Sequence, residues 1–178
     1  SGSLRFPWVR LYNRTMRTPF MDLFGLQAPI LQAPIANAAN VALVEAVGHG
    51  GGMGSLAITW TERDEGLALA AQLKATVVPF FFNFVLRFGV EHLPWYYQSG
   101  IPAVTLSWGI DGQCIADFKS AGIRVGVQVG SVAGAVAAIA AGADFIIVQG
   151  VEAGGHVQSS TPLAKLLADT VPVAGNTP

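Results

Sequence analysis

The chain has 178 residues, of which 52% are hydrophobic and only 12% are charged, and its net charge is −1. An average domain carries about 25% charged residues, so most of this chain is expected to lie against other protein, which excludes disorder. The small net charge gives no reason to expect a nucleic-acid partner. A single cysteine, Cys114, excludes an internal disulfide and favours a reducing, cytoplasmic location.

The first 20 residues differ from the rest of the chain. They contain four arginines and four aromatic residues but no acid: Arg5, Arg10, Arg14, Arg17, Phe6, Trp8, Tyr12 and Phe20. Such a segment could dock on a membrane surface or on nucleic acid, but an extension that packs on the barrel, or a partly ordered tail, is the simpler interpretation. We therefore expect a basic, aromatic N-terminal extension over residues 1–20 and a single domain over residues 21–178.

From residue 30 onward, strand-like segments alternate with helix-like segments. Strands are expected at residues 30–33, 53–58, 77–84, 103–107, 124–129, 145–148 and 171–174. The expected helices start at Asn37 or Asn40, at the capping-box-like Thr61–Asp64, at Asp111, at Ser131 and at Thr161–Pro162. Residues 85–100 are expected to form an irregular crossover with Trp95, Tyr96 and Tyr97 packed on the strands.

This alternation predicts an α/β protein with a parallel sheet. Six or seven consecutive units of similar length favour a TIM-type (β/α)8 barrel over an open, doubly wound sheet. A closed barrel needs eight strands and typically about 250 residues. We therefore expect a partial barrel that is truncated after the seventh strand.

A long uncharged stretch, residues 125–143, has glycines at the spacing of packed membrane helices. It divides better into a strand, a cap at Ser131 and an alanine-rich helix that ends at Gly142. No membrane span is expected.

A glycine cluster over residues 48–54 invites comparison with phosphate-binding loops. It leads from a helix into a strand, whereas phosphate loops lead from a strand into a helix. The cluster is better interpreted as a helix C-cap and a tight turn at the lower face of the barrel, with His49 as a capping or solvated side chain.

The segment from Gln149 to His156 follows the sixth strand directly, so it lies at the strand ends where barrel enzymes place their chemistry. Gly150, Gly154 and Gly155 allow the backbone to approach a flat ligand closely. His156 supplies a group that titrates near neutral pH, although a structural histidine in a loop is the alternative. Three histidines and one cysteine are too scattered to predict a metal site.

The same segment resembles the QGxEAGGH signature of the nitronate monooxygenases, a family of FMN-dependent enzymes. Other segments follow in that family's order: residues 29–36, 51–56, 82–84, 101–107 and 127–131. The resemblance covers roughly residues 21–175, and Glu152–His156 is its most specific part.

This resemblance implies an FMN site at the top of the barrel. The backbone of Ala33, Pro34 and Ile35 would contact the flavin ring, and Asn83 and Gln128 would bond its polar edges. Gln149, Gly150 and Gly155 would line the cofactor. Gly175 would remain from the turn that holds the FMN phosphate in this family.

The implied reaction transfers an electron from an alkyl nitronate to FMN, after which O2 gives a carbonyl compound and nitrite. His156 would face the substrate, either as a general base or as a cationic anchor. Two alternatives stay open. One is an FMN- and NAD(P)H-dependent enoyl-acyl-carrier-protein reductase, which shares a similar loop. The other is a noncatalytic barrel fragment that serves as a binding or assembly module.

Overall fold

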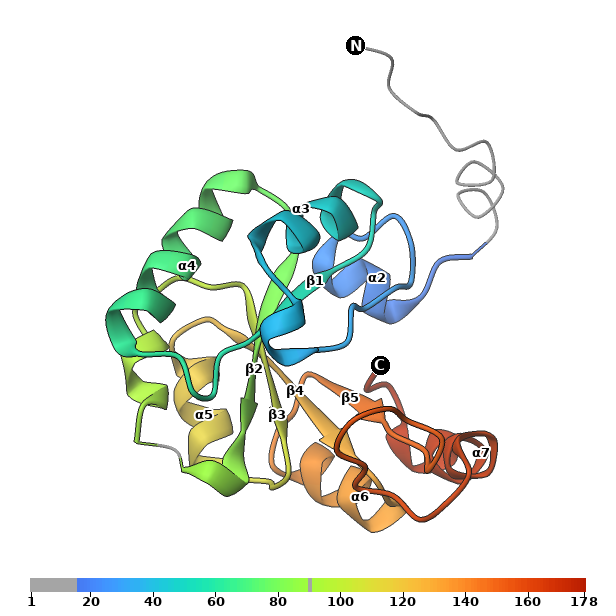
Figure 1. Ribbon diagram of the computed structural model, residues 1–178. Coiled ribbons are helices and arrows are strands. Elements are labelled where there is room, and N and C mark those ends of the chain that lie inside the picture. The colour runs from blue at the N-terminus through green and yellow to red at the C-terminus, as the bar shows by residue number, and fades with distance from the viewer. Residues whose placement is uncertain (1–15, 90) are drawn as a thin grey trace.

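The computed structural model describes residues 16–89 and 91–178, which form one curved, parallel sheet with helices packed around it (Figure 1). The sheet has five strands, and their order in space is their order in the chain. The strands are β1 (Gly54–Ala57), β2 (Phe80–Val85), β3 (Ala103–Ser107), β4 (Arg124–Val129) and β5 (Phe145–Val148). All four neighbouring pairs are parallel, as the predicted TIM-type α/β architecture requires.

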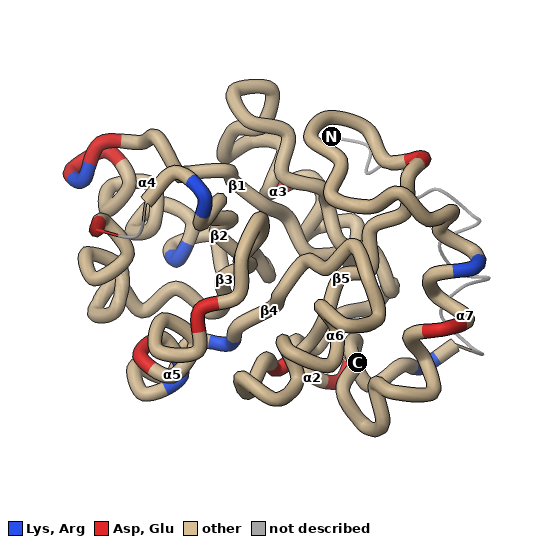
Figure 2. The backbone as a smooth tube through the Cα atoms, turned by 90° about the horizontal axis from the view of Figure 1, so that it is seen from below, with Lys and Arg blue, Asp and Glu red and all other residues tan. Residues whose placement is uncertain are grey.

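A helix follows each of the strands β1, β3, β4 and β5, and 3-10 turns occupy the crossover after β2. The α-helices are α2 (Pro19–Phe24), α3 (Val41–His49), α4 (Arg63–Thr76), α5 (Gly112–Ser120), α6 (Val132–Ala140) and α7 (Leu163–Ala174). Three 3-10 turns, η1 (Ala36–Ala38), η2 (Leu86–Phe88) and η3 (Leu93–Tyr96), complete the connections. Charged residues lie mainly on the helices and loops at the periphery of the protein (Figure 2).

Alternation along the strands gives the sheet an outer and an inner face. On β2, Phe80, Phe82 and Phe84 belong to the main core, which lies between the sheet and the helices. Phe81 belongs instead to a second, smaller core with Met21 of α2. The outer face of the sheet is therefore covered by the helices that connect the strands. The inner face is covered by α2 at the amino ends of the strands.

Several helix starts follow the predicted capping residues. The side chains of Asn40, Asp111 and Ser131 accept hydrogen bonds from backbone N–H groups in the first turns of α3, α5 and α6. The predicted capping box at Thr61–Asp64 is wrong, because α4 begins at Arg63 after Glu62, which makes no side-chain cap bond. The glycine cluster ends α3 and turns the chain into β1, as predicted, with Gly51 at φ +91°.

The predicted first strand, residues 30–33, is reduced to a single bridge between Leu31 and Met53. The side chain of Gln32 bonds both the N–H and the C=O of Ser55, and so occupies backbone positions that a strand partner would use. Pro29 and Pro34 have no N–H group to extend the pairing on either side.

The predicted seventh strand, residues 171–174, is also wrong, because this segment is the end of α7. Leu166 and Thr170 of α7 are buried one turn apart, and the helical pattern continues through Val171, which is 61% exposed. The valines predicted a strand from local propensity, and the packing of the preceding helical turns overrides that preference.

One further strand boundary differs from the prediction. The third predicted strand starts at Phe80 rather than Val77, since Val77 has a left-handed backbone at the end of α4. Residues 1–15 of the predicted basic extension lie outside the described residues. Of the remainder, Phe20 lies in α2 and packs edge-on against Phe145, with 5.2 Å between ring centroids.

Within the described part of the chain, every helix is too short or too polar to cross a bilayer.

Candidate active site

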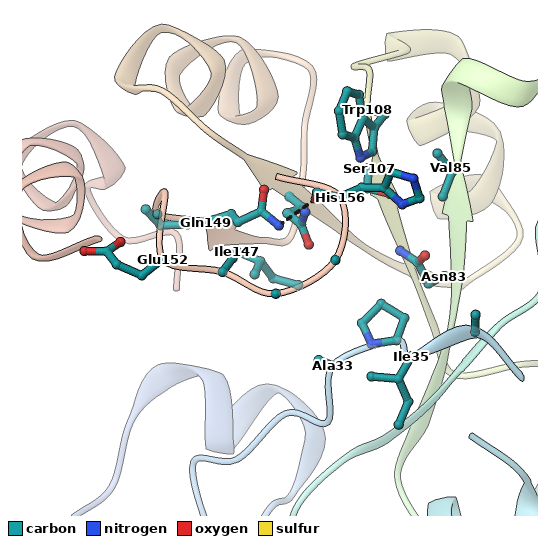
Figure 3. Close-up of a pocket in the computed structure, with 18 of the residues that line it drawn as sticks. Ala33, Ile35, Asn83, Val85, Ser107, Trp108, Ile147, Gln149, Glu152 and His156 are labelled. Atoms are coloured by element: carbon teal, nitrogen blue, oxygen red, sulfur yellow. Dashed lines mark hydrogen bonds between the residues drawn. The ribbon is translucent and has the colours of Figure 1, made fainter. Parts of the chain in front are cut away.

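A cavity of about 760 Å³ opens at the carboxyl ends of the strands (Figure 3). The segment Ala33–Ala36 forms one side of it. The ends of β2, β3 and β4 and the segment that follows β5 form the rest. Ligand cavities of this size are typical of small-molecule sites, and barrel enzymes place them at this end of the strands.

Nine of the ten residues predicted for the site line this cavity. They are Ala33, Pro34, Ile35, Asn83, Gln128, Gln149, Gly150, Gly155 and His156. Gly175 is not among them, because it follows the C-terminus of α7. Helices in this fold run back toward the amino ends of the strands, and Pro178 accepts a hydrogen bond from Ile146 near the start of β5. The prediction for Gly175 depended on the seventh strand, which the structure replaces with helix.

The loop that carries His156 is braced by Gln149. The Gln149 side chain accepts a hydrogen bond from the Gln158 N–H at 2.7 Å and donates one to the His156 carbonyl at 3.2 Å. Its amide therefore holds the two ends of the loop together. The sequence predicted that Gln149 lines the cavity, which it does, but not that its polar atoms are used by the loop.

Glu152 fixes the other side of this loop. Its carboxylate accepts a hydrogen bond from the N–H of Leu163, the first residue of α7, at 2.8 Å. A carboxylate at a helix N-terminus satisfies a free N–H group and interacts favourably with the helix dipole. The N–H of Val151 also bonds to the Thr161 carbonyl. The predicted catalytic loop is thus attached to the start of α7.

Trp108 is a cavity residue that the sequence interpretation missed. It follows β3 directly, has a left-handed backbone with φ of +59°, and packs edge-on near His156 with 6.1 Å between ring centroids. Its backbone N–H donates to Oε1 of Gln158 at 3.1 Å. A large aromatic residue immediately after a barrel strand was the available signal, because that position faces the ligand end of the barrel.

Two amide side chains point polar groups toward the inside of the sheet. Asn83 is buried, and its Nδ2 donates to the Thr105 hydroxyl at 2.9 Å, which fixes the orientation of its amide. Gln128 of β4 lines the same cavity, and its side chain makes no hydrogen bond with the residues that the structure describes. Gln128 is therefore available to bond the polar edge of a ligand.

The strongest pKa shifts lie outside the cavity, in the helical layer. Burial raises the pKa of the Cys114 thiol to about 12, with smaller contributions from Asp111 and Asp117. Burial likewise raises the pKa of Tyr97 to about 12. Cys114 is therefore a buried, protonated thiol, which confirms its interpretation as a core residue rather than a nucleophile. Over residues 16–89 and 91–178, no three metal-ligating side chains come together.

Comparison with known proteins identifies relatives that are named as oxidoreductases. A (3aS,4S,5R,7aS)-5-hydroxy-7a-methyl-1-oxo-octahydro-1H-indene-4-carboxyl-CoA dehydrogenase of Mycobacterium tuberculosis is 33% identical over 146 residues, which is 79% of this chain and 41% of the relative. A nitronate monooxygenase of Pseudomonas aeruginosa is 30% identical, over 79% of this chain and 52% of the relative. The chain thus spans about half the length of these relatives. No family model matches the sequence.

Solved structures share the same fold. FabK from Thermotoga maritima superimposes with a TM-score of 0.82 at 27% identity, over 89% of this chain and 51% of that protein. A nitroalkane oxidase from Streptomyces ansochromogenes gives a TM-score of 0.77 at 28% identity, over 86% of this chain and 57% of that protein.

The parallel fold, the cavity at its carboxyl edge and these relatives define the class as a (β/α)-barrel protein that is similar to oxidoreductases. Among these proteins, the nitronate monooxygenases are similar to this chain over about four fifths of its length.

Proposed function

We propose that this chain forms the nitronate-binding part of an FMN-dependent enzyme that oxidises alkyl nitronates with O2 to a carbonyl compound and nitrite. The observation that carries the proposal is the convergence of nine predicted site residues, including His156, on one cavity. The relatives named nitronate monooxygenase and nitroalkane oxidase support the same chemistry.

The cavity suits a flat cofactor with polar edges. The backbone of Ala33–Ile35 borders it on one side, and Gly155 borders it on another without a side chain that would obstruct a ring. The free amide of Gln128 matches the hydrogen-bonding edge of a flavin. FMN, when bound, supplies the electron acceptor for the oxidation.

His156 would act on the substrate itself. Its side chain is exposed at the cavity, where it could hold a proton removed from the substrate or, when protonated, attract the negatively charged nitronate. The hydrogen bonds of Gln149 to the loop would keep His156 in place during either step.

Replacement of His156 tests this role. We expect His156→Ala to lower the rate of nitrite release from ethyl nitronate by about a hundredfold or more, because positioned acid–base groups contribute on that scale. The visible absorbance of bound flavin should stay unchanged. His49→Ala, an exposed histidine at the end of α3, is the matched control and should keep full activity. Equal rates for His156→Ala and the unmodified protein would refute the role of His156.

A second candidate is an NAD(P)H-dependent reductase that acts on an acyl thioester. The relative named as a carboxyl-CoA dehydrogenase, which is 33% identical, favours it. Anaerobic mixing with NADPH separates the two functions. Rapid loss of the flavin absorbance would support the reductase, and an unchanged spectrum together with nitrite release would support the monooxygenase.

A further inference from the structure

We propose that Trp108 determines which substrates the cavity accepts, by forming the wall against which the substituent of the nitronate packs. This inference rests on the proposed function, because His156 marks the position of the reacting group. Trp108 lines the cavity, and its indole lies nearly perpendicular to the His156 ring, at an interplanar angle of 89° (Figure 3). A substituent on the reacting carbon would therefore meet the indole.

The backbone of Trp108 is held in an unfavourable conformation. Its φ of +59° is uncommon for a residue with a large side chain, and such conformations persist only where the surroundings impose them. The chain thus turns sharply at the end of β3 and leaves the indole at the cavity rather than in the core.

Gln158 supplies the constraint. Its Oε1 accepts the Trp108 N–H, and its own N–H bonds to Gln149, so one residue connects the loop after β3 to the loop that carries His156. The Nε2 atom of Gln158 is buried and has no hydrogen-bond partner within the described residues. The connection therefore lies inside the protein, and the positions of Trp108 and His156 depend on each other.

The cavity also contains aliphatic side chains. Val85, at the end of β2, and Ile35 line the same cavity (Figure 3). An indole and two aliphatic side chains favour a neutral hydrocarbon substituent, and a wall of fixed shape limits its length. The preferred substrates are thus nitronates with short, apolar substituents, and Trp108 sets the upper limit.

The test compares a series of nitronates, from ethyl to hexyl nitronate, in the FMN-loaded protein. We expect Trp108→Ala to raise kcat/KM for hexyl nitronate relative to ethyl nitronate by about tenfold or more, the scale on which a pocket discriminates hydrocarbon groups. Trp108→Phe should keep the original ranking. Trp60→Ala, which removes an indole that is 61% exposed and outside the cavity, is the matched control.

Gln158→Leu tests the connection between the loops. It removes the acceptor of the Trp108 N–H and should shift the ranking in the same direction as Trp108→Ala, mainly through KM. If all substrates change by the same factor in Trp108→Ala, or if Trp60→Ala shifts the ranking equally, the proposal is wrong.

Binding of nitroalkanes provides a readout that needs no turnover. Calorimetric titration with nitroethane and nitrohexane should show that Trp108→Ala improves the relative affinity for nitrohexane. Should Trp108→Ala fail to fold, as judged by circular dichroism, Trp108→Leu is used and should give the same shift. A protein that does not oxidise nitronates but still shows this shift would refute the proposed function alone; one that oxidises them without the shift would refute only the role of Trp108.

Discussion

The imidazole of His92 packs between two aromatic rings in the crossover that follows β2. Ring centroids of Phe84 and Trp95 lie 5.5 Å and 5.9 Å from that of His92, and its Nε2 is buried without a partner in the described part of the chain. Burial lowers the pKa of His92 from its ordinary value of 6.5, and the nearby Glu91 carboxylate only partly opposes this effect.

The consequence is a pH dependence of stability. Since the unfolded chain binds a proton at His92 more readily than the folded chain does, the free energy of unfolding should fall as the pH drops below about 6.5. We expect His92→Phe, which keeps an aromatic ring, to show a smaller decrease between about pH 7 and pH 5. Urea denaturation at several pH values measures the free energy of unfolding of both proteins. The same decrease with falling pH in His92→Phe and the unmodified protein would contradict the expectation.

At the scale of elements, the contact between the loop after β5 and the start of α7 depends on Gly150. A Cβ added at Gly150 would lie 2.5 Å from backbone and side-chain atoms of Leu163. A Cβ added at Gly154, in the same loop, would meet nothing within 4 Å, and Gly154 does not need a positive φ.

These two glycines therefore form a matched pair. Gly150→Ala should lower the free energy of unfolding by about 1–3 kcal/mol, because α7 must shift to relieve the overlap. Gly154→Ala should change it by less than about 0.5 kcal/mol, as expected for an open surface position. Chemical denaturation of both variants provides the measurement, and equal midpoints would show that the loop and α7 are not packed as described.

The elements also show what local sequence can predict. The strand at residues 103–107 and the caps at Asn40, Asp111 and Ser131 were predicted correctly, because capping and strand propensity act within a few residues. The segment 171–174 failed because its valines favour a strand locally, while α7 packs against α6 and β5 as one continuous helix.

The candidate site shows the same difference between local features, which can be predicted, and contacts between distant segments, which cannot. Gly150, Gly155 and His156 line the cavity as expected, and they could be selected from the sequence because they follow a recognisable strand in one short segment. Trp108 was missed because its position depends on Gln158, which is 50 residues away in the chain. The bracing role of Gln149 was missed for a similar reason, since the geometry of its loop exists only in the folded chain.

For the molecule as a whole, the strands of the sheet differ in how far they are buried. Residues of β3 are buried throughout, whereas three of the four residues of β5 are only partly buried. Strand β3 has a neighbour on each side, while β4 is the only strand paired with β5 in the described chain. Amide exchange should therefore be slowest in β3 and distinctly faster in β5. Hydrogen–deuterium exchange with mass spectrometry checks this, and equal protection of the two strands would argue against the arrangement.

The order of the strands has a consequence for how the protein is made. Each strand pairs with the strand immediately before it in the chain, so every pairing can form once the next strand has left the ribosome, without waiting for distant segments. Synthesis proceeds at roughly 5–20 residues per second, so a new strand emerges every few seconds and finds its template already in place. The sheet can therefore assemble strand by strand during synthesis, and the cavity is complete only after the last strand and the segment that follows it have been made.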